Sequence, residues 1–146
     1  MLPNYLPTEQ VANLGEISPI SQGVGSVSTG WVSMANVGAI LALVEVGVLG
    51  GSATVSASIN QATSNAGANS KAVTGKSITA ISTNNQCAMI NVSNDELDSN
   101  GGFTFVQLTL TVATAASLVG ARIFGCKPRN YPASLQNDAS VVQLVN

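Results

Sequence analysis

Acidic side chains gathered in one loop are the first candidates for chemistry in this sequence. Asp95, Glu96 and Asp98 lie within the segment SNDELDSNGG at residues 93–102, and carboxylates on flexible loops are ligands that calcium ions prefer. Their spacing does not follow the alternating ligand positions of an EF-hand loop. We therefore interpret the segment as a solvated loop and predict no metal site, with a calcium site as the alternative.

Two other charged residues interrupt apolar segments of the chain. Glu45 lies within AILALVEVGVL, and Arg122 lies within LVGARIFGC. Burying a carboxylate without a partner costs several kcal/mol, so a buried Glu45 would need a cation, and Arg122 is the natural candidate. The interpretation that the pattern favours is that each side chain points to solvent from opposite ends of the fold.

The chain contains no histidine, which is the commonest general base and proton shuttle. Ser-His and Cys-His nucleophile systems are therefore excluded. Cys87 and Cys126 form no close-spaced motif, so we interpret them as two small apolar residues without a disulfide framework. These observations predict that the protein is not an enzyme and that it has no catalytic residue and no cofactor.

Charged residues make up only 8% of the 146 residues, about a third of the usual share. Five Lys and Arg side chains cannot form an extended phosphate-binding surface, so nucleic acid is not an expected partner. The apolar run at residues 37–50 is shorter than a bilayer crossing, so a membrane is not expected either. Because a net charge of −2 protects a surface poorly against association, we expect neighbouring subunits to cover much of it.

Alternating apolar and polar residues predict a chain of short β-strands. In the segment at residues 103–112, four residues fall on one side of an extended chain and are predicted to face the core: Val106, Leu108, Leu110 and Val112. A second strand is predicted at residues 118–126, where apolar residues occupy both faces. The remaining predicted strands are 30–34, 39–49, 52–62, 76–82 and 87–93, with a hairpin turn at Gly50-Gly51.

These elements predict an all-β fold, an antiparallel two-sheet sandwich of jelly-roll or Greek-key type, with a barrel as the alternative. Residues 1–29 contain prolines, glycines and apolar residues without a sustained period, which indicates an extended N-terminal arm, with a disordered terminus as the alternative. We therefore predict an arm at residues 1–29, a sandwich domain at residues 30–133 and a C-terminal tail at residues 134–146.

Several segments together resemble the capsid cement, or decoration, proteins of tailed bacteriophages. The resemblance spans about Gly30 to Ser134 and follows the order GWVSM, a long apolar strand, INQAT at Ile59–Thr63, FTFVQLTLTV and ARIFGCKPRNYPAS. It implies a jelly-roll-like module that binds the outside of an assembled phage capsid as a homo-dimer or homo-trimer. The implied partner is the major capsid protein of the same virion, and the implied location is the capsid surface after assembly in the host cytoplasm.

Apolar residues of the arm and of the chain after the last strand are the expected contacts with that partner. An extended arm can add a strand to a neighbour's exposed sheet edge and so satisfy backbone groups there. The expected interface residues are Leu2, Tyr5, Leu6, Val11, Leu14, Ile17, Tyr131 and Leu135.

The alternative function is a carbohydrate-binding β-sandwich module of a phage tail or cell-surface appendage. Sugar sites usually present an exposed aromatic platform beside carboxylate or amide partners. In this chain three aromatic residues are candidates for that platform: Trp31, Tyr5 and Tyr131.

Overall fold

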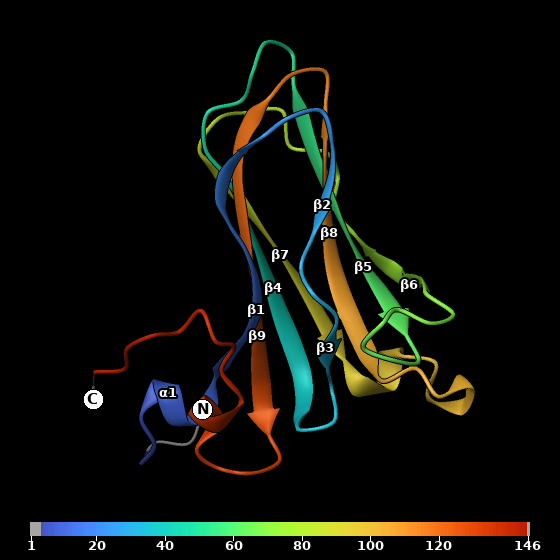
Figure 1. The fold of residues 1–146 in the computed structure, drawn as a ribbon, viewed down its shortest axis with the longest axis vertical. Coiled ribbons are helices and arrows are strands. Elements are labelled where there is room, and N and C mark those ends of the chain that lie inside the picture. Colours follow the sequence, from blue (N-terminus) through green and yellow to red (C-terminus); the bar gives the residue numbers. More distant parts are fainter. Residues whose placement is uncertain (1–3, 146) are drawn as a thin grey trace.

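Two antiparallel β-sheets pack face to face in the computed structural model, which describes residues 4–145 (Figure 1). Sheet A has the strand order β1-β9-β4-β7 and comprises β1 (Ala12–Gln22), β4 (Val37–Val46), β7 (Gln86–Ser93) and β9 (Ser117–Pro128). Sheet B has the order β2-β8-β5-β6, with β3 also paired to β8, and comprises β2 (Gly25–Ser28), β3 (Val32–Ser33), β5 (Thr54–Ala62), β6 (Lys71–Ser77) and β8 (Phe105–Ala113). The predicted all-β, two-sheet antiparallel sandwich is confirmed.

Short helical turns lie at the lower end of the sandwich in Figure 1. They are α1 (Pro7–Gln10), η1 (Asn94–Glu96), η2 (Ser99–Gly101) and η3 (Ala133–Gln136). No helix of the described residues 4–145 is long and apolar enough to cross a membrane.

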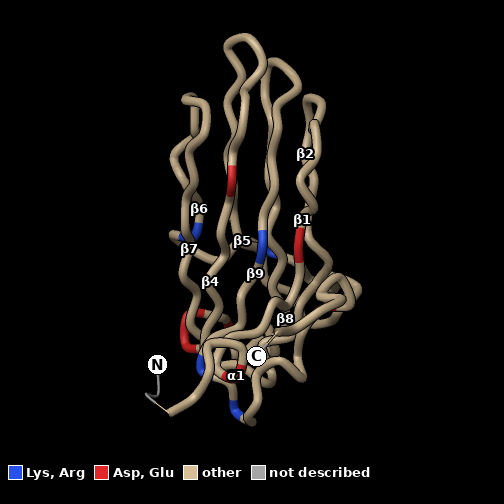
Figure 2. Tube along the Cα trace, turned by 90° about the vertical axis from the view of Figure 1, so that its left-hand side faces the viewer, with Lys and Arg blue, Asp and Glu red and all other residues tan. Residues whose placement is uncertain are grey.

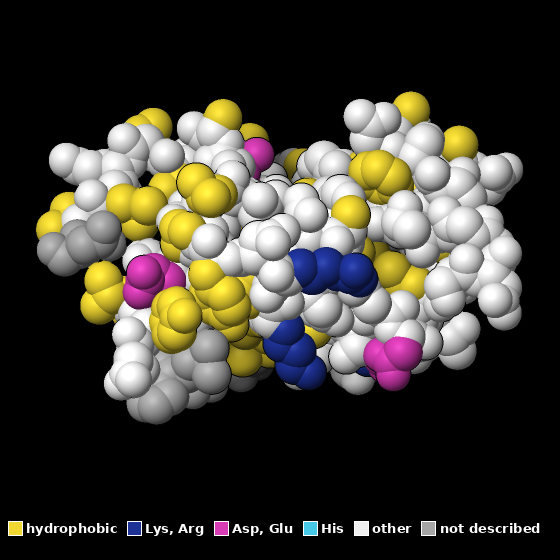
Figure 3. Space-filling view, turned by 90° about the horizontal axis from the view of Figure 1, so that it is seen from below, with side chains coloured by type: hydrophobic (Ala, Val, Ile, Leu, Met, Phe, Trp, Pro, Cys, Tyr) yellow, Lys and Arg dark blue, Asp and Glu magenta, His cyan; other side chains and the backbone are white. Residues whose placement is uncertain are grey.

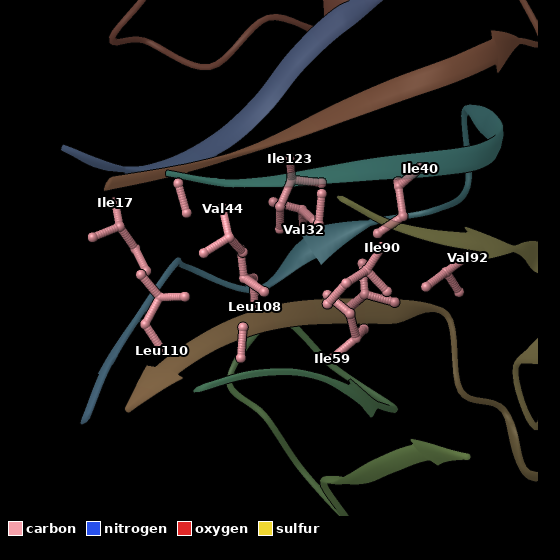
Figure 4. Close-up of a cluster of buried hydrophobic side chains, with 14 of the residues drawn as sticks. Ile17, Val32, Ile40, Val44, Ile59, Ile90, Val92, Leu108, Leu110 and Ile123 are labelled. Atoms are coloured by element: carbon pink, nitrogen blue, oxygen red, sulfur yellow. The ribbon is translucent and has the colours of Figure 1, made fainter. Parts of the chain in front are cut away.

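The core lies between the two sheets and follows the predicted alternation of β8. Val106, Leu108 and Leu110 are fully buried and Val112 is 1% exposed, so the inward face of this strand is confirmed. Side chains of sheet A, such as Ile123, point toward them across the sandwich (Figure 4). Burying each large aliphatic side chain stabilises the fold by about 1.5–3 kcal/mol, so this layer is the main source of stability.

Most of the predicted N-terminal arm is part of the sandwich. β1 pairs with β9 and β2 pairs with β8, so the sheets begin at Ala12, and the predicted boundary at Gly30 is wrong. The register of β1 shifts between Asn13 and Gly15 and again between Ile17 and Ile20. Because a β-bulge changes which face the next residue occupies, these shifts hide the alternation that would have identified the strand in the sequence.

The predicted hairpin at Gly50-Gly51 is wrong as well. β4 belongs to sheet A and β5 to sheet B, so the turn carries the chain from one sheet to the other. A Cβ on Gly50 would lie 2.5 Å from the carbonyl oxygen of Ala116, so only glycine fits at this crossing. β8 and β9 likewise lie in different sheets. A short loop indicates only that the two strands it joins are close in space. The strands can be hydrogen-bonded neighbours in one sheet, or they can belong to different sheets.

Candidate functional site

The acidic loop is held to the sandwich by lysines of β6. Asp98 Oδ2 lies 2.6 Å from Lys71 Nζ, and Glu96 Oε1 lies 2.7 Å from Lys76 Nζ. The lysine partners and backbone N–H donors hold the pKa of Glu96 and the pKa of Asp98 below their usual values. The two ion pairs tie residues 94–98 to β6, as the solvated-loop interpretation allows. Among residues 4–145, no cluster of three or more Cys, Asp and Glu side chains is arranged to hold a metal ion.

Arg122 forms an ion pair, but its partner is Glu16. The guanidinium Nη1 lies 2.6 Å from Glu16 Oε2, because these residues stand opposite each other on β9 and β1. Glu45 lies opposite Gly120 on β9 and is exposed, so the idea that it pairs with Arg122 is wrong. Sequence reasoning missed Glu16 because residues 1–29 had been interpreted as an arm outside the sheets.

The outer face of sheet A is the apolar surface of the molecule. It carries five large apolar side chains on alternate positions of β4, β7 and β9: Leu41, Leu43, Met89, Leu118 and Phe124. Met89 is 62% exposed and Leu118 is 47% exposed, whereas the other three are half-buried. The register places Leu43 beside Met89 and Leu41 beside Phe124. The apolar layer is divided, because Arg122 stands beside Leu43, and Glu45 with Gly120 separates Leu118 from the other four side chains.

A shallow groove of about 380 Å³ crosses the upper part of this outer face. Pro19 and Ile20 of β1 form one wall, Leu118 of β9 lies within it, and Glu45 is the only charged side chain in its lining. Gly120 adds no side chain to the groove, and a Cβ at this position would be in van der Waals contact with the Cα of Pro19 at 3.4 Å. The groove therefore offers an apolar surface beside one carboxylate.

The outer face of sheet B has the opposite character, because it is covered by hydroxyl groups. Ser26 and Thr111 are joined by a hydrogen bond of 2.8 Å, as are Ser28 and Thr109. Ser58 lies beside Thr109 on the neighbouring strand, which continues the polar row. Because these short side chains satisfy one another across the strands, this face resembles an ordinary solvated sheet surface.

Charged side chains are few on both sheets. Figure 2 shows most of the charged residues in the middle and lower parts of the molecule and one acidic residue on a strand above the middle, while the loops at the upper end carry none. Three of the cations in the described chain, Lys71, Lys76 and Arg122, are engaged in ion pairs. The described surface therefore has no extended cationic stripe that could follow a phosphate backbone.

Four of the expected interface residues gather at the lower end of the sandwich. Tyr5 and Leu6 precede α1, Tyr131 and Leu135 flank the start of η3, and α1 and η3 are in contact. The rings of Tyr5 and Tyr131 lie 4.9 Å apart, and the exposed fractions of the four residues range from 42% to 74%. We name this group the lower apolar cluster. Figure 3 shows hydrophobic side chains on this end, on the side of α1.

The other expected interface residues lie elsewhere. Ile17 is only 5% exposed and belongs to the core, so the expectation that it contacts a partner is wrong. Leu14 is partly buried and packs against the core from β1, and its contact with a partner stays a prediction. Val11 lines a second groove beside Phe124. Leu2 lies outside the described residues.

The candidate aromatic platform is dispersed. Trp31 is half-buried, and its indole lies against the loop after β5, since a Cβ on Gly67 would lie 2.6 Å from the indole Nε1. Only Tyr5 and Tyr131 form an exposed ring pair. Met89 and the leucines of the outer face were not among the expected interface residues, although apolar residues on both faces of β4 and β9 were the signal for Leu41, Leu43 and Leu118.

Comparison with known proteins assigns no family to the chain. No protein-family model and no curated protein matches it. Among solved structures it is similar to the CBM22-2 xylan-binding domain of Paenibacillus barcinonensis Xyn10C, with 9% identity over 80% of this chain and 98% of that chain and a TM-score of 0.42. It is also similar to infectious bursal disease virus Gt strain (10% identity, 85% of this chain and 33% of that chain, TM-score 0.40) and to TmCBM61 in complex with beta-1,4-galactotriose (12% identity, 87% and 99%, TM-score 0.36). These TM-scores are all below 0.5, so the similarities carry no argument about function. The β-sandwich follows from the strand pairing of this chain.

Proposed function

We propose that this chain is a non-catalytic structural module that binds the outside of an assembled phage capsid and stabilises contacts between major capsid subunits, as a capsid cement protein does. One observation carries the proposal: the outer face of sheet A exposes Met89 and Leu118, with the half-buried Leu41, Leu43 and Phe124 on the same face. Monomeric proteins rarely leave large contiguous apolar patches in water, and patches rimmed by polar groups mark protein contacts. The Glu16–Arg122 ion pair and Glu45 lie among these apolar side chains and supply the polar groups of this face.

The low charge of the chain supports contact with a repeating protein surface. With 8% charged residues in the chain, few charged groups have to lose their hydration when a partner covers the surface. In a symmetric shell, the same modest contact is repeated at every equivalent position. Binding that is selective for the assembled shell stabilises the shell by mass action, because it lowers the free energy of the assembled state alone.

The test compares substitutions on the two sheet faces. Met89→Glu with Leu118→Glu places carboxylates in the apolar layer, and Ser58→Glu with Thr111→Glu places the same charge on the hydroxyl face as a matched control. We expect the native chain and the control to co-sediment with expanded capsids and the outer-face variant to remain in the supernatant. Equal binding of all three proteins, or loss of binding in the control alone, would refute the proposed face.

A carbohydrate-binding module is the second candidate function, and the exposed Tyr5–Tyr131 pair favours it. Tyrosine rings present an apolar face and a polar hydroxyl, which suits the mixed surface of a sugar. Under this alternative, the protein would bind oligosaccharides on a glycan array and Tyr131→Ala would abolish the signal, with no affinity for capsids. Capsid binding that survives Tyr131→Ala, together with a blank glycan array, would exclude it.

A further inference from the structure

Three of the four sheet edges are protected against addition of another strand. At β1, the N–H of Asn13 donates to Asn137 Oδ1 and its carbonyl accepts from the N–H of Asp138, so the later chain covers part of this edge. β2 is only four residues long. β6 carries Lys71 and Lys76, and its register with β5 is broken. Short edges, irregular edges and lysines are common devices against edge-to-edge pairing.

The fourth edge, β7, lacks these devices. β7 is eight residues long with the sequence QCAMINVS, which contains no proline and no charged residue. Its register against β4 is unbroken, and no strand of residues 4–145 pairs with its other side. In an antiparallel ladder every second residue directs its N–H and C=O away from the neighbour, so β7 presents a row of backbone groups without a strand partner.

The chain also contains a segment suited to that edge. Residues 141–145, with the sequence VVQLV, are uncharged and rich in β-branched side chains, which favour strands. Val142 is 92% exposed and Val145 is 86% exposed. Within the described chain, no backbone hydrogen bond holds residues 142–145. Residues 142–145 therefore have backbone groups without a backbone partner, as the free edge of β7 has.

Reach prevents the segment from pairing with β7 of its own molecule. Figure 1 shows it leaving the lower end of the sandwich on the side of sheet A, and Asp138 is tied to β1, the strand farthest from β7 in that sheet. Three strand spacings of about 4.8 Å separate β1 from β7, roughly 14 Å. Residues 139–145 extend to about 25 Å at most, so crossing the sheet would leave too few residues to form a ladder.

We propose that residues 141–145 of one copy pair as an added strand with the free edge of β7 in a second copy. Backbone hydrogen bonds supply the attraction, and both surfaces are uncharged, so no charge is desolvated when they meet. Because donor and acceptor lie at different places on the molecule, the contact is head-to-tail and yields rings or chains. This inference does not depend on the proposed capsid function.

The experiment uses two variants that each lack one half of the contact. A chain ending at Ser140 keeps the β7 edge but has no donor, whereas Met89→Lys with Asn91→Lys keeps the donor but places two charges on the acceptor strand. Both substituted positions are exposed, and circular dichroism would confirm that each variant is folded. We expect the full chain to form concentration-dependent oligomers in sedimentation velocity and each variant to be monomeric alone.

Mixing the two variants is the decisive measurement. The donor of the lysine variant can bind the intact edge of the shortened chain, so an equimolar mixture should form a one-to-one complex that grows no further. Lys substitutions on the hydroxyl face, Ser58→Lys with Thr111→Lys, are the matched control and should leave oligomerisation unchanged. A full chain that is monomeric up to about 1 mM, or a mixture with no complex, would overturn the proposal. After either result, a strand from a different protein would be the remaining candidate partner of the β7 edge. Capsid co-sedimentation tests the proposed function separately.

Discussion

Ile17→Ala tests whether residues 12–22 are a strand of the sandwich or part of an arm. Ile17 is 5% exposed and packs in the core between the sheets. Truncating a buried isoleucine to alanine removes its apolar contacts and leaves a cavity, which costs about 2–5 kcal/mol of the free energy of unfolding. For a chain of this length, each kcal/mol lowers the melting temperature by roughly 2–4 °C. An arm residue in water would cost almost nothing when truncated.

Ile20→Ala is the matched control, because Ile20 lies on the same strand but is 49% exposed. Urea denaturation followed by circular dichroism would give both free energies of unfolding, and an unchanged slope would show that the unfolded states are comparable. We expect Ile17→Ala to lose at least about 2 kcal/mol and Ile20→Ala less than about 1 kcal/mol. A loss below about 0.5 kcal/mol at Ile17 would refute the placement of β1 in the core.

Three other measurements follow from the same contacts. Leu108→Ala should cost about 2–5 kcal/mol in urea denaturation, and a loss below about 0.5 kcal/mol would mean that the faces of β8 are assigned backwards. In a double-mutant cycle, Arg122→Ala and Glu16→Gln should show a coupling of at most about 1 kcal/mol, since the pair is partly exposed; a much larger coupling would contradict that exposure. Because the pKa values of Glu96 and Asp98 are lowered in the folded state, their stabilisation is present above their unfolded values near pH 4 and is lost as the pH falls through and below them. Glu96→Gln with Asp98→Asn should therefore flatten the decline of the urea midpoint between pH 5 and pH 3, and an unchanged decline would contradict the role of these ion pairs.

The segment that extends away from the sandwich is at the other end of the chain from the predicted N-terminal arm. The N-terminal residues from Ala12 onward are locked into both sheets, whereas residues 142–145 extend without backbone hydrogen bonds in the described chain. Leu135, which is 74% exposed, lies in the same part of the chain. The part of the molecule suited to reach a neighbour is therefore the end after β9.

Local patterns in the sequence determined the fold class and several surfaces. Alternation in FTFVQLTLTV identified the buried face of β8, because residues two apart on a strand must share a side of the sheet. The turn residues and the absence of an apolar helical stripe indicated an all-β sandwich. The lack of histidine and the scarcity of lysine and arginine argued against the common catalytic systems and a phosphate-binding surface. All of these features depend only on residue type and on spacings of a few residues.

Tertiary structure decided which strands pair, and with that the position of the candidate surface. Whether Gly50-Gly51 closes a hairpin or crosses between sheets depends on strands far away in the chain, since β4 lies between β7 and β9. The same long-range pairing set Glu16 opposite Arg122 and gathered Leu43 and Met89 into one apolar face. β-bulges concealed β1, because they break the period from which a strand is identified. The local sequence determines which residues form a strand and which face is apolar. The free energy of packing the whole sandwich determines which strands become neighbours.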